Sequence, residues 1–182
     1  MNKQNDIDSI TLGCLALGSE GALRKIIKRY NDDLMRYAFS LLKDREMAEE
    51  VVSEVFISFW SNRKRMKDII HLKRYLVVSV RNKSLSELSK KRILTSSEEN
   101  NEMYQLYSDH RSIEDDWISK EFYEFVMQKI DFLPQRCKEV LVMAKINGLK
   151  QYEIAEILSI SPKTVENTLA RALKKLHESV GI

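Results

Sequence analysis

The sequence predicts an all-α protein made of two small helical domains. Only two prolines and five glycines interrupt its 182 residues. Apolar residues recur every three or four positions through most of the chain, which is the period of a helix that packs on one side. This period fades in one polar stretch near the middle. We therefore expect a first domain over residues 1–92, a linker over 93–116 and a second domain over 117–182.

The composition excludes several kinds of protein. No apolar run is long enough to span a bilayer, and the N-terminus lacks the basic start and long apolar run of a signal peptide. The only two cysteines, Cys14 and Cys137, have no cysteine or histidine at metal-ligand spacing, so we expect reduced thiols and no bound metal. These observations favour a soluble, cytoplasmic protein.

Charge is unevenly distributed along the chain. Residues 61–92 carry eleven Lys or Arg against two acidic residues, whereas residues 93–118 carry one Arg against seven acidic residues. A concentrated basic region suits a polyanion such as DNA. The composition of the acidic linker fits a segment that becomes ordered on binding and an ordinary disordered tether equally well.

Three helices are expected in the first domain. Residues 20–42 and 45–60 each place their apolar side chains on one side, and a third helix is expected from His71 to about Lys91, after a basic loop over residues 61–70. The second of these helices carries a polar face opposite its apolar stripe. That face consists of Glu49, Glu50, Ser53 and Glu54.

The second domain is expected to begin with a helix from Trp117 to about Asp131. A break over 132–134 precedes a helix over 135–147, and Gly148 is placed to end that helix. Its large apolar residues are most simply assigned to the domain core. They are Trp117, Phe122, Tyr123, Phe125, Phe132 and Leu133.

The stretch over residues 148–176 predicts a helix-turn-helix. Small Ala155 allows the two helices to cross closely. Ser161 followed by Pro162 is a strong start signal for the second helix, since the hydroxyl can cap free amides and proline loses no hydrogen bond at the first position. Ser159 stands in the turn where glycine is common, and a positive φ there costs a serine roughly 1 kcal/mol.

The second helix of this unit has an apolar stripe and a polar outer face. The stripe is expected to contain Val165, Leu169, Ala172, Leu173 and Leu176. The outer face can bond phosphates and base edges. Its DNA-binding residues, with the cap residue, are expected to be Ser161, Lys163, Thr164, Asn167, Thr168 and Arg171.

These residues resemble a known family. The segment over residues 133–176, which contains EIAEILSISPKTVENTLARALKKL, looks like the promoter-recognising domain of the extracytoplasmic-function (ECF, group 4) sigma factors of bacterial RNA polymerase. Its TVEN and ALKKL motifs are similar to versions in the Bacteroidetes lineage. Residues 19–60 and 71–92 resemble the polymerase-binding helices and the −10 helix of the same family. The resemblance implies sigma domain 2, an acidic linker and sigma domain 4.

In this family the acidic face of the second helix docks on the β′ coiled coil of core RNA polymerase, and the β subunit is a further contact. The resemblance carries that role to Glu49, Glu50, Ser53 and Glu54. Glu50 stands where the family usually has Asp, and Ser53 where it usually has Gln, so an amide donor is lost.

The resemblance also assigns the basic region to recognition and opening of the −10 element, because a separated strand has to be held by positive charge and base pockets. The residues are Arg63, Lys64, Arg65, Lys67, Lys73, Arg74, Arg81, Asn82 and Lys83. The recognition helix is assigned to the −35 element. The implied partners are core RNA polymerase, promoter DNA and a membrane-bound anti-sigma factor.

Two other classes of protein use similar features. Response-regulator activators share the helix-turn-helix pattern but need an α/β receiver domain, and residues 1–92 lack alternating strands. A helical adaptor that binds an acidic protein would lack DNA retention that falls steeply with salt. We expect no enzyme, small-molecule substrate or cofactor, since the chain shows no phosphate loop, nucleophile motif or paired carboxylates.

Overall fold

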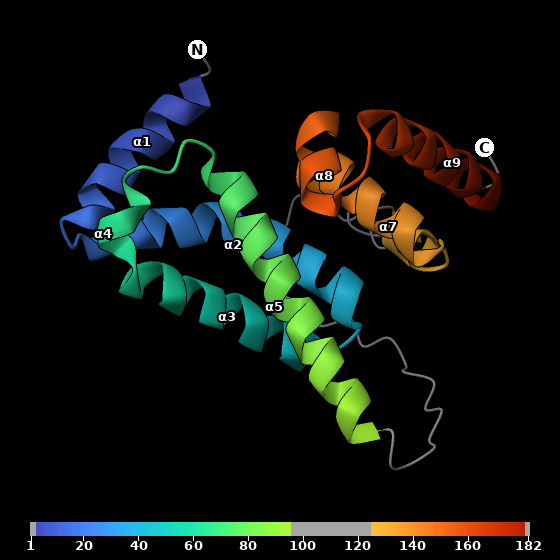
Figure 1. Cartoon of the computed structure of the whole chain (residues 1–182), viewed down its shortest axis with the longest axis horizontal. Coiled ribbons are helices and arrows are strands. Elements are labelled where there is room, and N and C mark those ends of the chain that lie inside the picture. Colours follow the sequence, from blue (N-terminus) through green and yellow to red (C-terminus); the bar gives the residue numbers. More distant parts are fainter. Residues whose placement is uncertain (1–2, 96–124, 181–182) are drawn as a thin grey trace.

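The computed structural model of the chain describes the backbone of residues 3–95 and 125–180 and the side chains of residues 8–91 and 125–179. Within these ranges the structure contains helices and no strand, as the sequence predicts (Figure 1). The first group of helices is α1 (Lys3–Ala16), α2 (Glu20–Leu42), α3 (Arg45–Ser61), α4 (Arg63–Met66) and α5 (Leu72–Thr95). The second is α7 (Gln135–Leu141), η1 (Val142–Ile146), α8 (Gln151–Leu158) and α9 (Pro162–Val180).

Helices α2, α3 and α5 pack against one another to form the first domain. Each of the first two begins at the cap that its sequence favours: Ser19 Oγ accepts from the Ala22 amide at 3.3 Å, and Asp44 accepts from the Met47 amide at 3.1 Å. The apolar stripes meet in one core, where Phe59 is 1% exposed. Because these apolar stripes are buried, the polar faces of α2, α3 and α5 point outward.

Helix α1 is an element that the sequence did not predict. Its apolar residues are not one-sided, since Leu12 and Leu15 are fully buried while Ile10 is 71% exposed. A buried polar contact joins the helix to α2, because the Tyr30 hydroxyl donates to Asp8 at 2.7 Å. Tertiary packing rather than a periodic pattern therefore holds α1 in place.

The second domain contains the predicted helix-turn-helix. Residues 125–131 are helical, and Gly148 ends the next helix with φ 62°. Ser159 adopts the left-handed conformation expected of the turn, with φ 52°. The Ser161 hydroxyl then accepts from the Thr164 amide at 3.0 Å, so α9 begins at the predicted serine–proline signal.

Two details of this domain differ from the prediction. Phe132 is 85% exposed and Phe125 is 40% exposed, so neither belongs to the core, whereas Leu133 is buried as expected. Phe132 lies in the break before α7, where the chain turns and only one of two neighbouring apolar side chains can face inward. The three other aromatic residues assigned to this core, and the linker between Thr95 and residue 116, lie outside the described residues.

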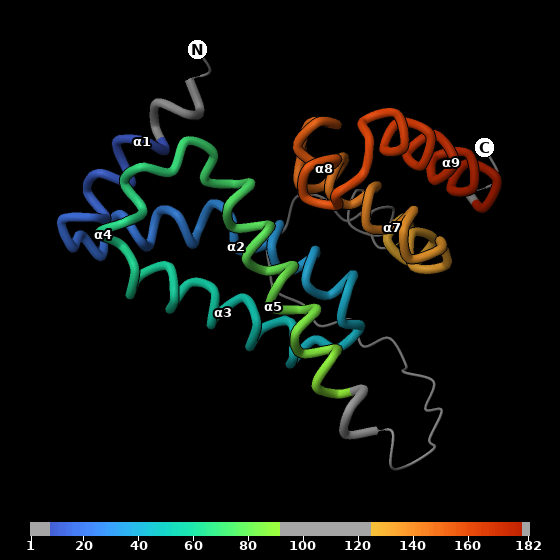
Figure 2. The backbone as a smooth tube through the Cα atoms, viewed as in Figure 1, coloured from blue at the N-terminus to red at the C-terminus, as the bar shows by residue number. Residues whose placement is uncertain are grey.

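The two domains pack against each other. Helix α2 contacts both α7 and η1, and the helices α7, α8 and α9 form their own group beside α5 (Figure 2). Polar groups take part in this contact: Lys43 pairs with Asp131, and the Asn147 side chain donates to the Asp33 carbonyl at 3.3 Å. None of the described helices has the length and apolar character needed to cross a membrane.

Candidate nucleic-acid interface

Helix α9 presents the exposed polar face that the sequence predicted for DNA contact. Lys163, Thr164, Asn167 and Arg171 are all exposed. Lys163 pairs with Glu166 one turn along the same helix at 3.0 Å, which is a weak surface contact. Within residues 8–91, no side chain of the other domain pairs with the amide, hydroxyl and basic groups on the N-terminal half of α9.

Thr168 was wrongly assigned to this face. It is only 8% exposed, because it follows the buried Val165 by three residues and precedes the buried Ala172 by four. The helical period therefore places it inside the packed stripe. Leu173 shows the reverse error, since it was expected in the stripe and is 40% exposed.

Small Ala155 lies where the two helices of the unit pack together. It is 4% exposed, and helices α8 and α9 contact each other. Its carbonyl accepts the Ile160 amide at 3.0 Å, which closes the turn around Ser159. This short turn fixes α9 relative to α8 and leaves the outer face of α9 uncovered.

The basic region over residues 61–70 is not a continuous loop, because the short helix α4 lies within it. Met66 is buried and anchors this turn. The Arg63 guanidinium lies 4.6 Å from the centroid of the Trp60 ring and donates to the Trp60 carbonyl at 3.2 Å, so it is partly structural. The exposed members of the −10 set are Lys64, Arg65, Lys67 and Asn82.

Two lysines of the −10 set form ion pairs within the first domain. Lys73 donates to Asp33 at 2.8 Å. Lys83 pairs with Glu54 of α3 and lies 3.6 Å from Glu87. The hydrogen bond that Lys83 donates to Glu54 is the main cause of a raised pKa at Lys83, so this lysine stays charged. These pairs reduce the positive charge that α5 offers to another molecule.

The two arginines of the −10 set on α5 contact the second domain. Arg74 pairs with Glu156 of α8, and Arg81 Nε donates to Glu139 of α7 at 2.9 Å. Arg136 also approaches Glu139, at 3.3 Å. No local pattern marks these acidic residues as partners of the arginines, because they lie 58 and 82 positions away along the chain.

Glu139 is nearly enclosed at this contact, and its side chain is only 8% exposed. The hydroxyl of Tyr37, on α2, is buried beside it. Burial is the main cause of a raised pKa at Tyr37, and the charge of Glu139 raises that pKa further. The phenol therefore stays neutral next to a carboxylate that two arginines neutralise.

The polar face of α3 is oriented as the sequence predicted. Glu49, Glu50 and Ser53 are exposed, and only Glu54 is half-buried through its contact with Lys83. Glu49 pairs with Arg45 one turn earlier at 3.1 Å. Three of the four residues assigned to polymerase binding are thus accessible on one helix.

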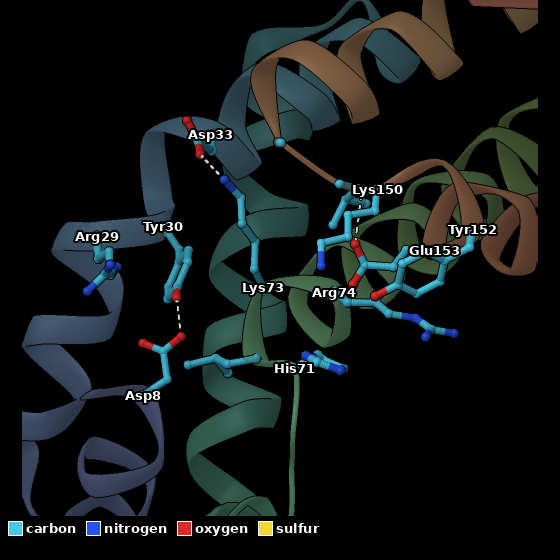
Figure 3. A pocket seen from close by; sticks show the side chains of 13 residues that line it. Asp8, Arg29, Tyr30, Asp33, His71, Lys73, Arg74, Lys150, Tyr152 and Glu153 are labelled. Carbon is cyan, nitrogen blue, oxygen red and sulfur yellow. Dashed lines mark hydrogen bonds and ion pairs between the residues drawn. The ribbon is translucent and has the colours of Figure 1, made fainter. Parts of the chain in front are cut away.

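A pocket of about 400 Å³ lies between the two domains (Figure 3). Arg29, Lys73 and Arg74 line it from the first domain, and Lys150 and Glu153 line it from the second. Its acidic groups are internally satisfied; Glu153, for example, accepts from the Lys150 amide at 2.8 Å. Across residues 8–91 and 125–179, no group of three metal-ligating side chains gathers there or elsewhere.

Comparison with known families agrees with this arrangement of two domains. Residues 26–93 match sigma-70 region 2, and residues 126–176 match sigma-70 region 4. The first match covers most of α2 to α5, and the second covers the helix-turn-helix domain. A chain that carries both regions in this order is a sigma-70 transcription initiation factor.

Individual relatives indicate which group of sigma factors the chain belongs to. The chain is 26% identical over 170 residues to the ECF RNA polymerase sigma factor SigW of Bacillus subtilis strain 168, covering 90% of this chain and 91% of that protein. It is 27% identical over 152 residues to the RNA polymerase sigma factor SigV of the same strain, covering 83% and 86%. The chain therefore belongs to the ECF sigma factors.

Solved structures share the fold. CnrH in complex with the cytosolic domain of CnrY superposes with a TM-score of 0.64 at 22% identity, over 96% of this chain and 97% of that one. The sigma factor RpoE of Bartonella quintana, in complex with the anti-sigma factor NepR, gives a TM-score of 0.71 at 16% identity, over 87% and 96%. The protein is an alternative sigma factor that binds core RNA polymerase and promoter DNA to direct transcription initiation. Sigma factors are not enzymes.

Proposed function

We propose that each domain of this sigma factor recognises one promoter element. The observation that carries the proposal is the uncovered N-terminal half of α9, with Lys163, Thr164, Asn167 and Arg171 exposed on a helix whose other side is packed. Helix-turn-helix units contact base edges mainly from this end. Asn167 is suited to paired hydrogen bonds with adenine, and Lys163 is suited to phosphate.

The first domain is proposed to hold the −10 element after strand separation. Lys64, Arg65 and Lys67 are exposed, and the half-buried Trp60 directly precedes the basic region in the sequence. Positive charge retains a single strand, and an aromatic ring can stack on an unpaired base. The limits 1–92 and 117–182 for the two domains, with a linker over 93–116, remain part of this proposal.

Polymerase binding is proposed for the exposed face of α3. Glu50 and Ser53 lie on this face with Glu49, opposite the buried Val51 and Val55. An acidic helix face fits a basic coiled coil, and polar contacts of this kind set orientation and association rate. A subunit of RNA polymerase acts in the cytoplasm, so we place this chain there.

An anti-sigma factor is a further proposed partner. Two solved structures that share this fold are complexes with a second protein, CnrY in one and the anti-sigma factor NepR in the other. We propose that a regulator of this kind, held at the membrane, also binds this chain.

The role of α3 is tested by reversing one charge. Glu50→Lys should reduce co-purification with core RNA polymerase at least tenfold, because it puts a cation against a basic surface. Glu20→Lys is the matched control, since Glu20 is also an exposed acid in the first turn of a helix but belongs to α2. Equal retention of wild type and Glu50→Lys by core polymerase would place the interface elsewhere.

A further inference from the structure

Two cations of the pocket between the domains have no carboxylate partner. Arg29 of α2 and Lys150, which directly precedes α8, line the pocket and are exposed. Within residues 8–91 and 125–179, neither forms an ion pair. Arg29 Cζ lies 5.7 Å from the ring centroid of Tyr30, and Lys150 Nζ lies 5.8 Å from that of Tyr152. Contacts of this kind are weak at exposed sites, so neither cation is needed to hold the fold.

The carboxylates that line the pocket are each engaged by another group. Asp8 accepts from the Tyr30 hydroxyl at 2.7 Å. Asp33 accepts from Lys73 at 2.8 Å. Glu153 accepts from a backbone amide at 2.8 Å, at the start of α8. These acids are therefore bonded inside the protein, and the two unpaired cations are left to a ligand of opposite charge.

Two helices also begin at this pocket. Residues 72–74 of α5 and residues 152–153 of α8 line it. The first amides of a helix have no acceptor within the helix. Lys150 stands at the N-cap of α8, and its side chain has no acceptor to offer them. Such amides and the helix dipole attract anions, so the pocket is suited to phosphate groups.

The positions of the unpaired cations favour an extended ligand. Figure 3 shows Arg29 and Lys150 on different sides of the pocket. A chain of phosphate groups can contact both sides, and each phosphate accepts charge-assisted hydrogen bonds. The volume of about 400 Å³ is that of an ordinary small-molecule site. Tyr152, which is 47% exposed, also lines the pocket, and its ring can stack on a base.

We propose that this pocket binds a small polyanion with a di- or triphosphate chain, either a nucleotide or inorganic polyphosphate, held by Arg29 and Lys150. The ligand contacts both domains at once, so it stabilises their present arrangement by an amount that rises with its concentration. Neither cation belongs to the residues assigned to DNA or to core polymerase. The site is therefore independent of which promoter element each domain recognises.

Isothermal titration calorimetry of the full chain, without divalent cations, tests the site. The probes are ATP, inorganic tripolyphosphate, orthophosphate and adenosine. We expect one site per chain for ATP and tripolyphosphate. Orthophosphate and adenosine should bind about tenfold more weakly or less, because each lacks the phosphate chain. Equal affinities for ATP and tripolyphosphate would identify the chain alone as the ligand, whereas tighter binding of ATP that is lost in Tyr152→Leu would identify a nucleotide.

Paired substitutions separate the site from general attraction to a basic protein. Arg29→Gln and Lys150→Gln should each weaken tripolyphosphate binding about tenfold or more, since each removes a charge-assisted hydrogen bond. Lys28→Gln and Lys145→Gln remove the same charge from exposed residues outside the pocket. At physiological salt they should change the affinity less than about twofold, because exposed charges are screened.

Thermal unfolding checks that the variants fold. All four residues are exposed, so the unliganded variants should unfold at the wild-type temperature. Tripolyphosphate should raise the midpoint of wild type and of Lys28→Gln and Lys145→Gln, but not that of Arg29→Gln or Lys150→Gln. Absence of binding, several equivalent sites, or an equal loss in the control variants would overturn the proposal. A loss confined to the variant of one domain would equally overturn a site shared by both.

Discussion

The two surfaces proposed for DNA differ in what their charged side chains contact. On α9, Lys163 pairs with Glu166 of the same helix, and Asn167 is exposed. On α5, Arg74 and Arg81 pair with acidic residues of the other domain. Under this proposal the outer face of α9 can enter a major groove as it stands, whereas α5 would first have to exchange carboxylates for phosphates. Binding to the −35 element should therefore need less rearrangement than binding to the −10 element.

The largest expected effect distinguishes the packed side of α9 from its exposed side. Thr168→Asp should destabilise the protein by about 2–4 kcal/mol, because Thr168 is 8% exposed and a carboxylate there would be buried without a partner. Asn167→Asp should leave the thermal midpoint within a few degrees of the wild-type value and instead abolish DNA binding by repelling phosphate. Thermal unfolding and filter binding measure the two effects. An equally stable Thr168→Asp protein would mean that this side of α9 is not packed.

The next effect concerns the junction between the domains. Burial lowers the pKa of Lys138 to about 8 in the folded protein, below the value near 10.4 of an unfolded lysine. The unfolded state then binds more protons between pH 8 and 10, so this group makes the folded protein more stable as pH rises through that window. Between pH 8 and pH 10, the free energy of unfolding of the wild type should rise by about 1–2 kcal/mol more than that of Lys138→Met.

Urea unfolding at pH 7, 8, 9 and 10 measures that difference. Comparison with Lys138→Met removes contributions from other groups that titrate in the same range. Lys138 donates to the Asp131 carbonyl at 2.8 Å and lies 3.3 Å from its carboxylate, so Asp131→Asn should raise the cost of burying the lysine. Parallel pH profiles for wild type and Lys138→Met would show that Lys138 is not desolvated.

A smaller effect distinguishes strand retention from duplex binding. Lys64 and Arg65 are exposed, whereas Arg63 also packs on Trp60, so the double substitution Lys64→Ala, Arg65→Ala changes charge without changing that packing. In reconstituted holoenzyme, permanganate reactivity of −10 thymines should fall severalfold. The slope of log K against log salt for single-stranded DNA should flatten by about 1.4. Wild-type reactivity in the double mutant would count against a −10 role for this region.

The sequence predicted those features that depend on local pattern. Ser161 and Pro162 marked the start of α9, and the spacing of Val165, Ala172 and Leu176 gave its packed side. Thr168 was misplaced because its polar character was given more weight than its position in that period. Helix α1 was missed because its exposed Ile10 and buried Asp8 break the apolar pattern.

Features that depend on distant parts of the chain were not predictable. Glu139 and Glu156 carry no local sign that they meet Arg81 and Arg74, since surface acids are common on helices. Their pairing follows from how α2 packs on α7 and η1. The outer face of α9 was therefore largely predictable from sequence, whereas the ion pairs of α5 required the tertiary structure.

Binding-site selection with reconstituted holoenzyme tests most directly whether one domain reads each promoter element. Wild type, Asn167→Ala and Lys163→Ala are compared on a library randomised at both elements. Asn167→Ala should relax the preference at one base pair of the −35 element, at a cost of about 1–3 kcal/mol, and leave the −10 preference unchanged. Lys163→Ala should weaken all sequences alike. If Asn167→Ala altered the −10 preference, or no position at all, α9 would not be the reader of the −35 element.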